Sequence, residues 1–168
     1  MEGKLIDAEP LLLAAIEINP GHPEANLFGA LCAARRGDDT SALTLLTRAH
    51  ELAPHNAEIV RDYGAMLLRA GQPKKALKVL KRAVGLLGQL HTLGDKSAHS
   101  RGALASAQMK LSAALLTLNQ HAECISAAGA AAALEPSIAS ALSGLQKLCE
   151  RGRDEGLDTS KVKIDLAL

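Results

Sequence analysis

The residues best suited to metal or redox chemistry are six histidines and three cysteines, and they are scattered along the chain. His121 and Cys124 are three positions apart, and on a helix this spacing places two metal ligands on one side. No other histidine or cysteine lies near them in the sequence, and Cys124 fits a small packing position. We therefore interpret both residues as packing residues, and we expect no metal ligand here.

No catalytic motif stands out among the remaining polar residues. The chain has no Ser/His/Asp order, HExxH helix, Walker loop or Rossmann glycine pattern. Its glycine-rich positions read as helix ends, not as loops that lead from a strand into a helix. We expect a protein that is not an enzyme, with no catalytic residues and no cofactor.

The thiols and the first residues indicate a compartment. Cys32, Cys124 and Cys149 cannot all pair, so we expect reduced thiols that pack as small apolar groups. No secretion signal follows the mixed-charge start of the chain, and no run of apolar residues is long enough to span a bilayer. The sequence predicts a cytoplasmic protein without membrane insertion.

One cluster of positive charge has two interpretations. It could be a landing surface for an acidic or phosphate-bearing partner, or simply a solvated outer helix face, and we favour the second. The cluster comprises Lys74, Lys75, Lys78, Lys81 and Arg82. Because the net charge is only +1 and Phe28 and Tyr63 are the only aromatic rings, we expect no nucleic-acid partner.

Along the sequence, small and aliphatic residues recur at an interval of 34 residues. A fixed period of this length is typical of stacked structural units. Each unit contains a helical run that ends at a glycine and a second run that ends near a proline. The recurring sets are Ala8, Ala42 and Ala76; Leu12, Leu46 and Leu80; Ala15, Ala49 and Ala83; Pro20 and Pro54; Gly37 and Gly71. With apolar residues at 48% and almost no rings, the composition favours close-packed helices and an all-α fold.

Two antiparallel helices in 34 residues resemble the tetratricopeptide repeat. One unit carries Tyr63, Gly64, Gly71, Ala76, Leu80 and Ala83; the unit before it carries Gly29, Ala30, Gly37, Ala42, Leu46, Ala49 and Pro54. The earlier unit departs from the family pattern at Asn26 and Ala33, where larger residues are usual. The resemblance implies a right-handed α-solenoid of stacked antiparallel helix pairs.

The period predicts the division of the chain. We expect a repeat domain over 1–150, made of a half unit at 4–20, units at 22–54, 56–88 and 105–136, and a capping helix at 137–150. A charged tail follows at 151–168. The step from Ala76 to Cys124 is 48 residues, 14 more than the period. We expect the extra residues to lengthen two helices into a hairpin at 73–119; a loose loop is the alternative.

The resemblance also implies a binding surface, because first helices of such units line a concave groove. The predicted groove residues are Glu24, Leu27, Phe28, Leu31, Arg35, Glu58, Arg61, Asp62, Ala65, Arg69, Met109, Lys110, Ala113 and Thr117. Some family members clamp the C-terminal carboxylate of heat-shock chaperones with lysine, arginine and asparagine side chains. Of the matching positions here, only Lys110 has the required charge and Asp62 would repel such a ligand.

We expect a protein-interaction scaffold that binds a peptide or helical segment of another protein in this groove. Three alternatives stay open at this point. The chain could be a chaperone for secreted client proteins, or a docking or regulatory segment of a larger enzyme. It could also self-associate through the N-terminal half unit, where leucine and isoleucine side chains are exposed.

Overall fold

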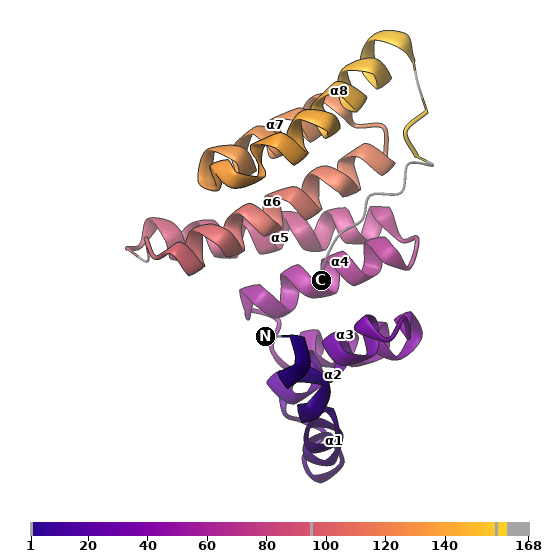
Figure 1. The fold of residues 1–168 in the computed structure, drawn as a ribbon, viewed down its shortest axis with the longest axis vertical. Helices are drawn as coiled ribbons and strands as arrows, with labels where there is room; N and C mark the ends of the chain where they lie inside the picture. The colour runs from indigo at the N-terminus through magenta and orange to yellow at the C-terminus, as the bar shows by residue number, and fades with distance from the viewer. Residues whose placement is uncertain (1, 95, 157, 161–168) are drawn as a thin grey trace.

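A computed structural model describes residues 2–94, 96–156 and 158–160, and within these ranges the chain is helical without a strand. The helices are α1 (Glu2–Ile18), α2 (Pro23–Arg35), α3 (Asp39–Leu52), α4 (Ala57–Arg69), α5 (Pro73–Thr92), α6 (Ala98–Thr117), α7 (His121–Leu134), the 3₁₀ helix η1 (Pro136–Ile138) and α8 (Ala139–Glu155). They follow one another along the longest axis of the molecule, from α1 at one end to α8 at the other (Figure 1). The predicted all-α fold is confirmed.

Polar side chains cap the starts of α3, α4 and α6. Asp38 accepts a hydrogen bond from the backbone N–H of Ser41 at 3.0 Å, and Asn56 accepts from Ile59 at 3.3 Å. Ser97 likewise accepts from the N–H of Ser100 at 3.1 Å. Each cap satisfies a backbone donor that the first helical turn leaves without a partner.

The first helix of each unit ends in a left-handed residue that reverses the chain. Gly37 and Gly71 have φ angles of 80° and 69°, a region that glycine enters without steric cost. Asn119 takes the same role after α6 with a φ of 57°. The short reversal places the two helices of a unit antiparallel, and α2 packs on α3, α4 on α5, and α6 on α7.

The repeating small residues form the core. Ala42, Leu46 and Ala49 of α3 are fully buried, as are the equivalent Ala76, Leu80 and Ala83 of α5. In α7 the fully buried residues are Cys124, Ala128 and Ala131, so the 14-residue shift of register is confirmed. Methyl-sized side chains at these positions allow close approach of neighbouring helices.

The extra residues lengthen α5 and α6 to 20 residues each, and the two helices pack along each other (Figure 1). The added turns contribute to the core, since Leu87 of α5 and Leu104 of α6 cluster with Ala57 at the start of α4. Leu93, which follows α5 at the tip of the hairpin, is 85% exposed. The predicted hairpin is therefore present, and the alternative of a loose loop is wrong.

The C-terminal part differs from the predicted layout. The last helix does not end near residue 151, because α8 continues to Glu155 before Gly156 turns the chain with a φ of 68°. Residues 158–160 then return to the end of α6, where the buried hydroxyl of Thr159 lies 2.7 Å from the carbonyl oxygen of Leu116. The alternating Val162, Ile164, Leu166 and Leu168 lie outside the described residues.

Candidate functional site

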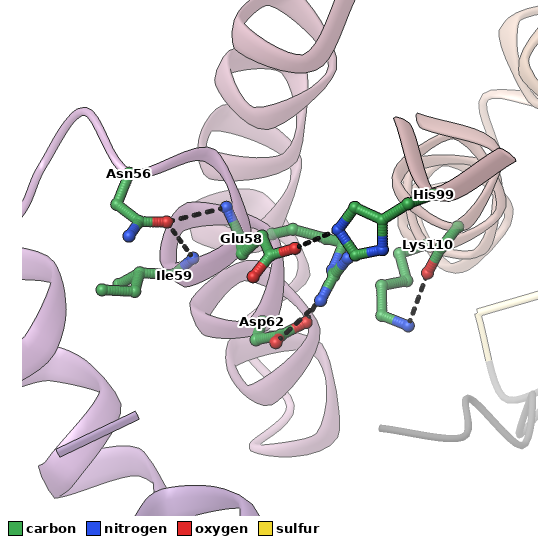
Figure 2. A network of polar contacts seen from close by, with 8 residues as sticks. Asn56, Glu58, Ile59, Asp62, His99 and Lys110 are labelled. Atoms are coloured by element: carbon green, nitrogen blue, oxygen red, sulfur yellow. Dashed lines mark hydrogen bonds and ion pairs between the residues drawn. The ribbon is translucent and has the colours of Figure 1, made fainter. Parts of the chain in front are cut away.

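Charged side chains gather where the first helices α4 and α6 lie next to each other (Figure 2). Glu58, Arg61 and Asp62 come from α4, on successive turns of one side of that helix. His99 and Lys110 come from α6 and point toward α4 (Figure 2), and Ser106 of α6 accepts a hydrogen bond from Lys110. We call these six residues the polar cluster.

Arg61 and Asp62 form the most enclosed ion pair of the polar cluster. The Nε and Nη2 atoms of Arg61 donate to the two carboxylate oxygens of Asp62 at 2.8 Å and 3.0 Å. Asp62 is only 5% exposed. Burial by itself lowers the pKa of Arg61, but the hydrogen bond and charge of Asp62 outweigh it and raise that pKa. The guanidinium therefore stays charged and fixed in orientation.

Lys110 places a second positive charge on the opposite helix. Its ammonium group donates to the hydroxyl of Ser106 at 3.3 Å, and the residue is 6% exposed. Burial lowers the pKa of Lys110, the charge of Arg61 lowers it further, and the carboxylate of Asp62 acts in the opposite direction. Two cations, one from each helix, thus interact electrostatically with Asp62.

The contact between Glu58 and His99 forms the solvent-facing end of the polar cluster. Nε2 of His99 lies 3.1 Å from Oε1 of Glu58, and the side chain of His99 is 81% exposed. A side-chain contact this exposed contributes little to folding. A partner can reach these two side chains without displacing buried groups.

The other predicted groove residues do not join the polar cluster. Leu27 is buried in the core, Leu31 packs against that core, and Met109 packs against Ala128 and Ala131. Arg69 pairs with Asp39 across α3 and α4. On α2, Glu24 and Arg35 are exposed, and Phe28 is a 41% exposed ring. The structure thus brings together Glu58, Arg61, Asp62 and Lys110.

His99 and Asn26 have roles that the repeat pattern does not predict. His99 lies in the inserted residues, which have no counterpart in the repeat period, so no register could assign it to a face. Asn26 is fully buried, and its Nδ2 donates to the carbonyl oxygens of Pro20 and His22 at 3.0 Å and 2.8 Å. In the sequence, only its departure from the repeat pattern marks Asn26 as unusual. Its two hydrogen bonds hold the turn that precedes α2.

The residues first considered as metal ligands have other neighbours. His121 Nε2 lies 2.9 Å from the hydroxyl of Thr159, and Cys124 Sγ lies 2.6 Å from Sγ of Cys149 in α8. Burial raises the pKa of both thiols, which keeps them protonated. Among the residues that the structure describes, no three His, Cys, Asp or Glu side chains group as a metal site. No helix within these residues is long and apolar enough to cross a membrane.

Comparisons with known proteins agree with the helical-repeat fold. Residues 33–89 match the family model of the tetratricopeptide repeat. Among solved structures, the fold is similar to MamA residues 41 to the end from Desulfovibrio magneticus RS-1, with 22% identity, a TM-score of 0.63, and coverage of 91% of this chain and 89% of that one. A further crystal structure of a MamA protein gives 17% identity, a TM-score of 0.63, and coverage of 99% and 91%. At these identities the likeness shows the fold, an α-solenoid. No curated protein sequence matches the chain.

Proposed function

We propose that the chain, whose residues 33–89 match the family model of the tetratricopeptide repeat, is a scaffold that binds a peptide segment of another protein against α4 and α6. The polar cluster is the observation that carries this proposal. A helical repeat needs only apolar contacts between its first helices. Here the interface holds Arg61, Asp62 and Lys110, three charges whose burial costs stability.

The polar cluster defines the kind of peptide that fits. The polar cluster contains two acidic groups, Glu58 and Asp62, and two basic groups, Arg61 and Lys110, so these charges balance. Glu58 and Arg61 are partly exposed, whereas Asp62 and Lys110 are buried beside them. Along the stack, Phe28 presents an exposed ring on α2, and such a ring suits an apolar anchor. We propose a ligand segment with charges of both signs and one apolar side chain. The role is non-catalytic, and reduced buried thiols would fit a cytoplasmic setting.

A peptide selection with matched variants tests this function. Peptides selected from a random displayed library are measured by fluorescence polarisation against the full chain. Glu58→Lys reverses a charge of the polar cluster at a partly exposed position, and we expect the affinity to fall at least about fivefold. Arg61 is not replaced, because its loss would leave the carboxylate of Asp62 buried without its partner.

The control for this experiment is Glu51→Lys, an identical charge reversal at an exposed position on α3. We expect it to leave peptide affinity unchanged. Equal losses in the two variants, or a loss only with Glu51→Lys, would show that peptides bind on another face and would overturn the proposal. Circular dichroism of both variants verifies that helix content is retained.

Exposed apolar side chains on α1 support a second proposal, that the protein self-associates. Leu11, Leu13 and Ile18 are 74%, 45% and 86% exposed, and neighbouring exposed apolar side chains are typical of contact surfaces. We expect light scattering to show a mass that rises with concentration, and the double variant Leu11→Ser, Ile18→Ser to remain monomeric. A wild-type mass that stays monomeric at high concentration contradicts this second proposal.

A further inference from the structure

A pocket of about 340 Å³ lies on another part of the surface from the polar cluster. It is lined by His50 of α3, Tyr63 and Leu67 of α4, and four residues of α5. None of its lining residues belongs to the polar cluster. A volume of this size accommodates a small organic molecule.

The wall formed by α5 carries three positive charges. Lys75, Lys78 and Arg82 are spaced by three and four positions, so they share one side of the helix. No carboxylate is among the lining residues, and neither Lys75 nor Lys78 forms an ion pair within the described part of the chain. By contrast, Lys81 on the next side of α5 pairs with Glu123 at 3.2 Å. The charged side chains that line the pocket are therefore all positive, which attracts an anion.

The floor of the pocket is apolar and flat. The rings of His50 and Tyr63 stack with centroids 4.9 Å apart and an angle of 22° between their planes. Leu67 is 3% exposed, and Val79 completes the apolar lining. This floor offers contact area to a ring or an alkyl group.

One polar atom at the floor lacks a partner. Nδ1 of His50 is buried and has no hydrogen-bond partner among the residues that the structure describes. At the rim, Nη2 of Arg82 lies 3.4 Å from Nδ1 of His55. This contact holds the guanidinium of Arg82 beside the pocket.

We propose that this pocket binds a small phosphate monoester with an apolar body. The phosphate lies against Lys75, Lys78 and Arg82, and the apolar body lies on Tyr63, Leu67 and Val79. A phosphate monoester carries close to two negative charges and three acceptor oxygens at neutral pH. The three cations that line the pocket therefore match it better than they match a carboxylate, which carries only one charge. Lys75, Lys78 and Arg82 of the positive cluster on α5 thus form part of a ligand site.

Isothermal titration calorimetry with phenyl phosphate on the full chain tests the proposal. Inorganic phosphate supplies the charged group alone, and phenol supplies the ring alone. We expect saturable binding of phenyl phosphate, at least about tenfold tighter than either fragment, because both halves of the pocket contribute. Binding of inorganic phosphate that equals phenyl phosphate would contradict a role for the apolar floor.

A matched pair of lysine variants locates the site. Lys78→Ala removes a charge that lines the pocket, whereas Lys74→Ala removes the same charge from the same helix outside it. We expect Lys78→Ala to weaken phenyl phosphate about tenfold and Lys74→Ala less than about twofold. Equal effects would show attraction to the general charge of α5, and absence of saturable binding would also overturn the site.

Two larger ligands identify the source of the phosphate. Free phosphotyrosine represents a phosphorylated side chain, and adenosine monophosphate represents a metabolite. If either ligand binds more tightly than phenyl phosphate, the result supports the site and identifies the source of the phosphate. This tighter binding should be lost in Lys78→Ala and retained in Lys74→Ala. The assay uses no peptide partner, so its outcome is independent of the proposed function.

Discussion

At the scale of the residue, glycine sets how closely α4 and α5 approach. A Cβ atom built on Gly64 would lie 2.7 Å from Cγ and 2.8 Å from Cδ2 of Leu80, which is fully buried. We predict that Gly64→Ala lowers the free energy of unfolding by about 1–3 kcal/mol, because Leu80 must move within a filled core. Urea denaturation measures the change.

Gly85 is the matched control for this prediction. It also lies within a helix, α5, but a Cβ atom there meets nothing within 4 Å. Gly85→Ala should therefore raise the free energy of unfolding by about 0.5–1 kcal/mol through helix propensity alone. If both variants shifted the free energy of unfolding in the same direction, the close contact of α4 and α5 at Gly64 would not be what makes a larger residue destabilising there.

A second prediction at this scale concerns His50 and acid. Burial lowers the pKa of His50 below its ordinary 6.5, the charge of Arg82 lowers it further, and Glu51 acts against both. The unfolded chain then takes up the proton first, so stability falls as pH drops below about 6.5 and the loss is complete below the folded pKa. Lys75 and Lys78 also line its pocket and oppose a positive imidazole.

His50→Gln should reduce this loss of stability in acid. We expect the melting temperature of the variant to fall less than that of the wild type between about pH 7.5 and pH 5. Differential scanning calorimetry at both pH values measures the two decreases. Equal decreases would mean that His50 is protonated as readily in the folded chain as in the unfolded one.

At the scale of the element, Thr159 attaches the segment after α8 to the turn between α6 and α7. Its hydroxyl lies 2.8 Å from Oδ1 of Asn119 and 2.9 Å from Nε2 of His121, and its N–H donates to the same Asn119 atom at 2.9 Å. We predict that Thr159→Val, which keeps the shape, lowers the free energy of unfolding by about 1–3 kcal/mol. Chemical denaturation is again the measurement.

Ser160→Ala provides the comparison for Thr159. Ser160 is exposed, and its contact with Asp158 uses the backbone N–H, which alanine retains. We expect this variant to match the wild type. A Thr159→Val protein as stable as Ser160→Ala would show that the attachment of residues 158–160 contributes nothing to the fold.

The elements also show what the sequence could predict. Helix starts at Asp38, Asn56 and Ser97 follow from local capping chemistry, and the buried alanines follow from the repeat period. The position of Thr159 was not predictable, because its partners lie about 40 residues earlier and belong to no repeat. The closeness of Cys124 and Cys149 likewise depends on how α8 packs on α7.

The candidate site was predicted only in part for the same reason. Helical spacing places Glu58, Arg61 and Asp62 on one side of α4, so that half of the polar cluster follows from the sequence. His99 enters it through the 14 inserted residues, whose register depends on how the lengthened helices pack. Leu27, by contrast, lies in the core. Helical spacing alone cannot separate the residues that face the groove from their neighbours on the same side of the helix that pack inward.

At the scale of the whole molecule, the stack has a core that is shared from unit to unit. Leu43 and Tyr63 pack against both the cluster around Leu46 and the cluster around Leu80. Each helix pair is thereby buried by its neighbours, and the surface of α4 and α6 keeps a fixed shape on which charged groups are held in place. Separate faces of the same stack can then hold a peptide and a small anion.

The most direct measurement is amide hydrogen exchange of the full chain with and without a peptide selected against it. We predict that the peptide slows amide exchange in residues 57–69 and 98–117, around Glu58, Asp62 and Lys110. Glu58→Lys should remove that response at the same peptide concentration. Protection confined to α3 and α5, with α4 and α6 unchanged, would contradict the assignment of the polar cluster as the binding surface.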